Sequence, residues 1–111
     1  GYYDEYYESA LKMKKLITKE LNEAFVKMDL ILTPTTPTPA FKLGEKTLEP
    51  ISMYLADIFT VPANIAGLPS ISIPSGFTEI EGKSLPLGIE LTAGWGREDN
   101  LFMAGKEFLR E

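Results

Sequence analysis

Cysteine and histidine are both absent from the 111 residues of this chain. Their absence excludes disulfides, thiolate nucleophiles, catalytic triads that use histidine, and zinc sites built from Cys and His. Serine, threonine, lysine, tyrosine and the carboxylates are the residue types that remain for chemistry. The range of reactions that this chain could catalyse with its own side chains is therefore narrow.

Long hydrophobic runs are also missing, because no apolar stretch approaches the roughly 20 residues that span a bilayer. The chain does not open with a basic and then apolar leader, since Tyr2, Tyr3, Asp4 and Glu5 stand at its start. Positive charge is scarce: 11 basic residues face 16 acidic ones, and the net charge of −5 argues against direct nucleic-acid binding. We therefore expect a soluble, cytoplasmic protein without a membrane segment.

The residues that are present have the composition of one globular domain. Hydrophobic residues make up 44% of the chain and charged residues 24%, which is typical of folded domains and not of disordered tails. A chain of this length forms one core. It begins with Gly1 in place of Met, so we expect that it was processed or cut from a longer protein, and we favour the cut.

Hydrophobic spacing predicts the first half of the fold. Apolar residues at steps of three and four predict a long amphipathic helix over about residues 2–27. Its apolar stripe is so wide that it needs a large body to lie against, and the rest of the chain is small. Residues 29–33 predict a buried interior strand. The prolines that follow predict an extended loop as far as Pro50, with a turn at Gly44.

Two short helices are predicted next. Ser52 can cap a helix over roughly residues 53–59, Pro62 can open a second helix as its first residue, and Gly67 suits the end of that helix. The two helices are expected to meet at Thr60 and Val61.

The last third of the chain predicts two strands and a helix. Polar and apolar residues alternate over residues 70–74 and 85–91, which predicts two strands joined across a turn at Gly82. A final helix is predicted over residues 97–110, with Asp99 or Asn100 in its first turn. The order of helices and strands predicts an α/β fold.

One acidic residue stands within an otherwise apolar stretch. Asp57 is flanked by Leu55, Ile58 and Phe59, and burying an unpaired carboxylate is costly. It therefore needs solvent, an internal partner or the cationic group of a ligand. From the residues alone we favour the solvated face of a short helix, with the three apolar neighbours turned inward, because most acidic residues are surface groups. A ligand role stays open.

Three serines, three glycines and four acids invite a chemical role. They are Ser70, Ser72 and Ser75; Gly88, Gly94 and Gly96; and Asp57, Glu79, Glu81 and Glu90. We interpret the serines as polar strand positions, because neither a Gly-x-Ser-x-Gly motif nor a neighbouring base accompanies them. The glycines are interpreted as turn and bulge residues, since no phosphate-binding motif surrounds them. The acids are too dispersed to predict a carboxylate pair.

Four segments occur in an order and spacing that resembles the amidase-signature enzymes. These are residues 1–7, 29–37, 53–76 and 85–89. Asn64, Pro69, Pro74 and Gly76 are shared with many members, and we interpret them as architecture of the loop behind the pocket. The opening Gly1-Tyr-Tyr-Asp-Glu-Tyr-Tyr7 and the run Tyr54-Leu-Ala-Asp57 are most similar to A subunits of glutamyl-tRNA(Gln) amidotransferases. The resemblance covers essentially the whole chain.

The resemblance implies a large α/β domain with a mixed sheet flanked by helices, and with a Ser-cis-Ser-Lys triad upstream of these segments. Residues 1–111 would then be the C-terminal portion of one amidase domain, without its upstream catalytic part and inactive alone. The parent would hydrolyse glutamine to supply ammonia, working with B and C subunits. A partner subunit would use ATP and magnesium to convert Glu-tRNA(Gln) to Gln-tRNA(Gln). No catalytic residue, metal or cofactor is expected in this chain itself.

The resemblance also implies a role for Asp57, which matches the position that holds the α-amino group of substrate glutamine. A carboxylate facing an ammonium group suits the selection of an amino acid over a plain amide. Two alternatives stay open. One is another amidase-signature enzyme that acts on small, nylon-type or fatty amides and does not need Asp57. The other is a non-catalytic module that self-associates to cover the apolar face of helix 2–27.

Overall fold

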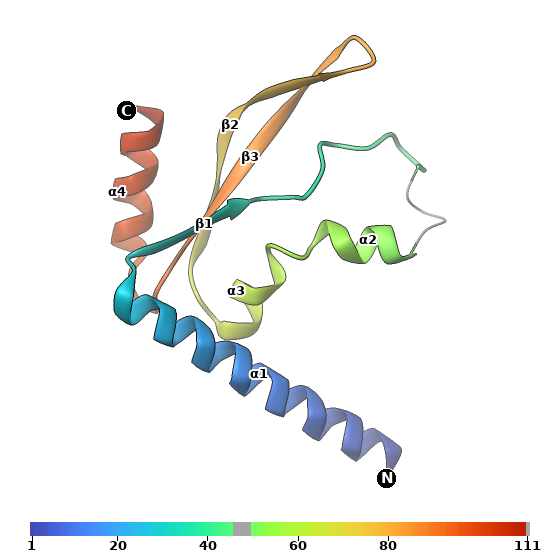
Figure 1. The fold of residues 1–111 in the computed structure, drawn as a ribbon, viewed down its shortest axis with the longest axis vertical. Helices are drawn as coiled ribbons and strands as arrows, with labels where there is room; N and C mark the ends of the chain where they lie inside the picture. Colours follow the sequence, from blue (N-terminus) through green and yellow to red (C-terminus); the bar gives the residue numbers. More distant parts are fainter. Residues whose placement is uncertain (46–49, 111) are drawn as a thin grey trace.

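The computed structural model describes residues 1–45 and 50–110. In chain order, its elements are α1 (Tyr2–Lys27), β1 (Leu30–Pro34), α2 (Pro50–Ala56), α3 (Val61–Ala66), β2 (Ser70–Ile80), β3 (Lys83–Ala93) and α4 (Glu98–Leu109) (Figure 1). The chain thus combines helices with strands in the predicted order, and the α/β class that the sequence predicts is confirmed.

The three described strands form one sheet in the order β1-β3-β2, and both pairings are antiparallel. β2 and β3 form a hairpin in which Glu81 and Gly82 have φ values of 51° and 75°. Positive φ at both central positions is the turn geometry that matches the twist of the flanking strands. Each strand has 11 residues, so the hairpin is longer than the alternating segments predict.

β1 lies at the edge of the described sheet, so the prediction of an interior strand is wrong. It pairs only with β3, and its Leu32 is 61% exposed. The central strand is β3, whose last residues, from Glu90 to Ala93, are buried. A short apolar run indicates that a strand exists, but it does not indicate which neighbours cover the strand.

The core lies between α4 and one face of the sheet. Ile73 of β2, Leu91 and Ala93 of β3, and Leu101 of α4 form the buried cluster. Side chains alternate along a strand, so the neighbouring residues of β2 and β3 point to the opposite face. In Figure 1, α4 lies on one side of the hairpin and the two short helices lie on the other. The apolar face of the sheet therefore packs against α4, whereas Pro62 and Ala63 of α3 lie toward its polar face.

α1 spans the residues that the apolar spacing predicts, but only its C-terminal half packs against the body. None of its residues is buried. The half-buried ones are Ile17, Thr18, Leu21, Ala24 and Phe25. Tyr3 is 80% exposed and Met13 is 56% exposed, and Figure 1 shows the N-terminal end of α1 projecting away from the other elements. The described residues therefore leave most of the apolar stripe uncovered.

The two short helices differ from the prediction at their boundaries. α2 begins at Pro50, so Ser52 lies inside the helix and not in front of its first residue. Proline suits a first helical position, because its φ is preset and the N–H that it lacks would have no partner there. α3 begins one residue before Pro62 and ends as predicted at Gly67, which has a left-handed φ of 68°.

Candidate functional site

Asp57 lies in a turn, residues 57–60, between α2 and α3. It is exposed, and its carboxylate has no ion pair or hydrogen bond within residues 1–45 and 50–110. The prediction that its apolar neighbours turn inward is wrong for Leu55 and Ile58, which are 51% and 45% exposed, and only Phe59 is half-buried. Solvent, rather than an internal partner, accounts for the charge of Asp57 in this structure.

Backbone hydrogen bonds fix Asp57 on both sides. Its N–H donates to the carbonyl of Tyr54 at 3.2 Å, and its own carbonyl accepts the N–H groups of Thr60 and Val61, each at 3.1 Å. The Thr60 hydroxyl donates to the same carbonyl at 3.3 Å. Because both peptide groups of Asp57 are held, the direction in which its side chain leaves the backbone is held as well.

A cavity of about 180 Å³ lies between this turn and the polar face of the sheet. Ile58, Phe59 and Pro62 line it on the side of the turn, and Thr33 and Thr92 line it on the side of the sheet. Its lining holds no charged side chain and is mostly apolar. Asp57 does not line this cavity, so the cavity is not a binding site that its carboxylate could serve.

Glu90 is an acidic residue whose burial the sequence does not predict. It is 5% exposed, and the Thr33 hydroxyl donates to Glu90 Oε2 at 3.5 Å. Burial raises the pKa of Glu90, while the hydroxyls of Thr33 and Ser70 partly lower that pKa. Within the described residues no cation pairs with it. Hydroxyl groups alone therefore satisfy this carboxylate.

The three serines lie in β2, as the strand interpretation predicts, and two of them form hydroxyl pairs. Ser72 Oγ lies 2.7 Å from Thr35 Oγ1, and Ser70 Oγ lies 2.7 Å from Thr92 Oγ1. Gly88 lies within β3 beneath the first pair, where a Cβ would come within 3.0 Å of Thr35 Oγ1 and 3.1 Å of Ser72 Oγ. Gly88 is therefore not a turn residue, and the close approach of these two hydroxyls explains why glycine stands here.

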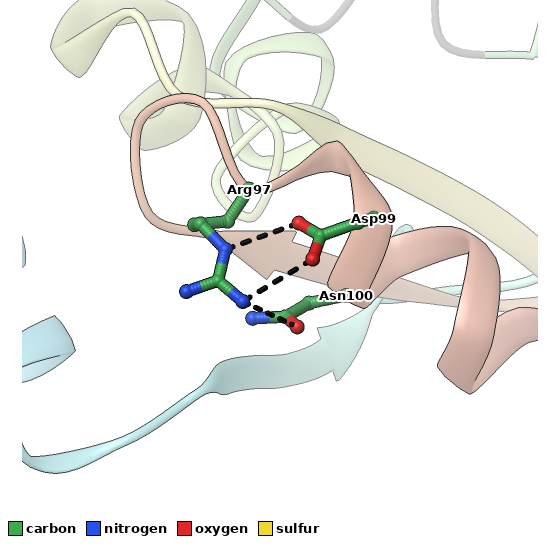
Figure 2. A network of polar contacts seen from close by, with 3 residues as sticks. All are labelled: Arg97, Asp99 and Asn100. Carbon is green, nitrogen blue, oxygen red and sulfur yellow. Dashed lines mark hydrogen bonds and ion pairs between the residues drawn. The ribbon is translucent and has the colours of Figure 1, made fainter.

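A second polar cluster lies at the start of α4 (Figure 2). Arg97 Nε and Nη2 donate to the two oxygens of Asp99 at 3.0 and 3.2 Å, and Nη2 also donates to Asn100 Oδ1 at 3.1 Å. The Asp99 carboxylate raises the pKa of the Arg97 guanidinium, and hydrogen bonding to Arg97 lowers the pKa of Asp99. Because the two charges satisfy each other bidentately, this cluster leaves no free charge for a substrate.

The described part of the chain carries neither a metal-binding cluster nor a membrane span. No three acidic side chains gather there in a way that could hold a metal ion. No helix in it combines the length and the apolar character that crossing a bilayer requires.

The four acids that the sequence singles out differ in how their charge is satisfied. Glu81 pairs with Lys42 at 2.8 Å, and Glu90 is buried among hydroxyls. Asp57 and Glu79 are exposed and have no ion pair within the described ranges. Of these two, Glu79 stands near the tip of the β2–β3 hairpin, whereas Asp57 stands in a turn whose backbone is fixed from both sides.

The sequence model of the amidase family matches residues 1–102. The chain belongs to the amidase family. It is 53% identical over 102 residues to an A subunit of glutamyl-tRNA(Gln) amidotransferase from Clostridium acetobutylicum, a match that covers 92% of this chain and 20% of that protein. The A subunit of Ruminiclostridium cellulolyticum is 50% identical over 111 residues, 100% of this chain and 22% of the relative.

A third relative, the A subunit of Carboxydothermus hydrogenoformans, is 65% identical over 77 residues, which are 69% of this chain and 16% of that protein. These matches confirm the resemblance to amidase-signature enzymes and to A subunits of glutamyl-tRNA(Gln) amidotransferases. The chain spans about a fifth of the length of the curated amidase-family relatives that it matches.

Proposed function

We propose that this chain supplies the substrate-ammonium wall of a glutamine-hydrolysing amidase, as the C-terminal portion of one amidase domain. Asp57 carries the proposal, because its exposed carboxylate has no partner within the described residues and its backbone is fixed on both sides. A fixed carboxylate is suited to receive the α-ammonium group of glutamine. The catalytic serines and lysine would come from the remaining part of the amidase domain.

The electrostatics of Asp57 favour this role over a purely structural one. A carboxylate that stabilised the fold would have a donor or a cation beside it, and Asp57 has neither within residues 1–45 and 50–110. An ion pair with a substrate ammonium gains strength when the surrounding protein excludes water. A substrate that lacks the ammonium would forgo this contact, so Asp57 would select an amino acid over a plain amide.

The names of the relatives support a place in an amidotransferase complex. We propose that the parent protein takes glutamine as its substrate and that the released ammonia passes to the B and C subunits. There, ATP and magnesium would be used to convert Glu-tRNA(Gln) to Gln-tRNA(Gln). The net charge of −5 supports an indirect role toward the tRNA, because a surface that binds phosphates needs excess positive charge.

A chimeric protein tests the proposal directly. In this chimera, the chain replaces the matching residues of the Clostridium acetobutylicum relative, and the assembled complex is assayed with glutamine and separately with ammonia. Asp57→Asn should raise the KM for glutamine about ten- to a hundredfold, since a charge-assisted contact contributes about 1.5–3 kcal/mol. The ammonia-dependent reaction should be unchanged. Glu79→Gln, which removes another exposed acid, is the matched control.

An unchanged KM for glutamine in Asp57→Asn would contradict the proposal. It would favour an amidase that acts on small or fatty amides, and assays with such amides would then identify the substrate class. A loss of both the glutamine and the ammonia reactions would instead indicate that Asp57 supports the fold of the protein.

A further inference from the structure

Thr60 occupies the N-cap position of α3 but does not cap the helix. An N-cap threonine ordinarily accepts a hydrogen bond from a backbone N–H of the second or third helical residue. Here Thr60 has helical backbone angles, φ −95° and ψ −27°, and no such bond. The second helical residue is Pro62, which has no N–H to donate. The hydroxyl of Thr60 is therefore free to turn back along the chain.

That hydroxyl donates to the carbonyl of Asp57 at 3.3 Å. The carbonyl of Thr60 itself accepts a hydrogen bond from Asn64 Nδ2 at 2.9 Å. Two side-chain hydrogen bonds thus connect α3, through Thr60, to the first residue of the turn. We call this pair of hydrogen bonds the Asp57 latch.

We propose that Thr60 and Asn64 are positioning residues for Asp57, and this inference rests on the proposed function above. A carboxylate recognises an ammonium group only if it is held within roughly 0.5 Å and 10–20° of the productive geometry. α2 contributes little rigidity, because none of its residues is buried. The latch adds a side-chain hydrogen bond to the backbone bonds that Thr60 and Val61 donate to the Asp57 carbonyl. It thereby strengthens the link from Asp57 to α3, which contains the buried Ala63 and packs on α1.

The latch fixes the direction in which the Asp57 side chain points and takes no part in the chemical reaction. Neither side chain reaches the carboxylate of Asp57, since both hydrogen bonds end on backbone carbonyls. The architectural interpretation of Asn64 from the sequence therefore becomes a specific one: its amide holds Thr60, and Thr60 holds Asp57. Losing the latch should disturb only reactions in which Asp57 contacts the substrate.

Thr60→Val and Thr60→Ser in the chimera form a matched pair. Valine keeps the shape of threonine and removes the donor, whereas serine keeps the donor. Thr60→Val should raise the KM for glutamine about two- to tenfold, the range expected for one lost neutral hydrogen bond, with kcat and the ammonia-dependent reaction unchanged. Thr60→Ser, which keeps the donor, should leave the KM for glutamine at the parent value. Asn64→Asp, whose ionised side chain cannot donate to a carbonyl, should resemble Thr60→Val.

A glutamine analogue without the α-amino group separates positioning from a general structural defect. The ratio of kcat/KM for glutamine to that for glutaramate should fall about two- to tenfold in Thr60→Val, because only glutamine uses Asp57. A structural defect would lower both values and leave the ratio unchanged, which would overturn the inference. Combining Thr60→Val with Asp57→Asn should give no further fall, and a full additional fall would also overturn it.

The failure of the latch can be distinguished from the failure of the proposed function. If Asp57→Asn raises the KM for glutamine while both Thr60→Val and Asn64→Asp leave it unchanged, the latch is wrong and the role of Asp57 stands. If Asp57→Asn itself leaves the KM and the selectivity ratio unchanged, the proposed function is wrong and the latch has no substrate contact to position.

Discussion

The sheet face beneath α4 and the N-terminal half of α1 both carry apolar side chains, yet within the described residues only the first is covered. Leu101 of α4 is 2% exposed and Ala93 of β3 is fully buried, whereas Tyr3 and Met13 of α1 are 80% and 56% exposed. Hydrophobic spacing therefore determines which residues share a face, and the presence of a facing surface determines whether they are buried. A contiguous exposed apolar face indicates an interaction surface, which supports a role beside the rest of an amidase domain.

The Asp57 turn belongs to the poorly covered part of the molecule. In α2, which leads into it, Tyr54 is 81% exposed and Ile51 is 74% exposed. Local order in such a segment depends on hydrogen bonds more than on packing. This contrast explains why the hydrogen bonds of the turn carry the geometry of the candidate site.

Leu101→Ala, in the covered core, should have the largest effect on the unfolding free energy. Removing a fully enclosed leucine costs about 2–5 kcal/mol of unfolding free energy, because apolar contact is lost and a cavity remains. Met13→Ala, at an exposed position of α1, should change that free energy by less than about 0.5 kcal/mol. Urea unfolding of both variants measures the difference. Equal losses would mean that α1 is covered in solution.

Gly88→Ala should cause the second-largest loss of stability, and it tests the packing on the polar face of the sheet. The added methyl would press on the Thr35–Ser72 hydroxyl pair at 3.0–3.1 Å, and such overpacking costs about 1–3 kcal/mol. Gly94→Ala is the control, since its Cβ would meet Phe25 at an ordinary 3.6 Å. Adding Thr35→Ala and Ser72→Ala removes both hydroxyls that the new methyl would meet. The cost of Gly88→Ala should then be smaller than in the parent chain, and an unchanged cost would mean that the pair is not the obstacle.

The sequence predicts the bounds of elements that have strong periodicity. It does not predict properties that depend on the neighbouring elements, such as the position of a strand in the sheet. The bounds of α1 follow from about seven turns of regular spacing, whereas the edge position of β1 depends on which strand lies beside it. The hairpin is longer than predicted because the prediction ends the first strand at Pro74, yet Pro74 lies inside β2. Pro86, which the predicted second strand already contains, lies inside β3. Proline is tolerated there because β2 is an edge strand and β3 pairs with β1 only over residues 89–93, beyond Pro86.

The candidate site was predictable only in part. The position of Asp57 in an apolar run marks it as a residue that needs a partner, but the apolar run does not reveal that the residue lies in a turn outside α2. The proposed role of Asp57 comes from the family resemblance. The Thr60 hydroxyl bond could not be predicted, because Thr60 before Pro62 has the pattern of an ordinary N-cap.

Glu90→Gln should have a smaller, pH-dependent effect. Because burial raises the pKa of Glu90 above its ordinary value of 4.5, the folded chain holds this proton to higher pH than the unfolded chain does. Stability is therefore lost as the pH rises from the ordinary pKa through the raised pKa. Glutamine cannot ionise, so the variant lacks this loss of stability. The Tm of the variant minus that of the parent should therefore increase as the pH rises from about 4 to about 7. A parallel Tm profile for both proteins would contradict this, and Glu79→Gln controls for the loss of one negative charge.

The smallest effect on stability should come from Leu16→Lys, which places a charge on the uncovered face of α1. Leu16 is 50% exposed, so the unfolding free energy of the chain should change by less than about 0.5 kcal/mol. Association should change instead, because the lysine would be buried wherever another surface covers this face. Sedimentation should show weaker self-association of the chain than in Ser9→Lys, and the chimera should lose stability. If both variants behave alike, this face of α1 is open to solvent in the assembled protein as well.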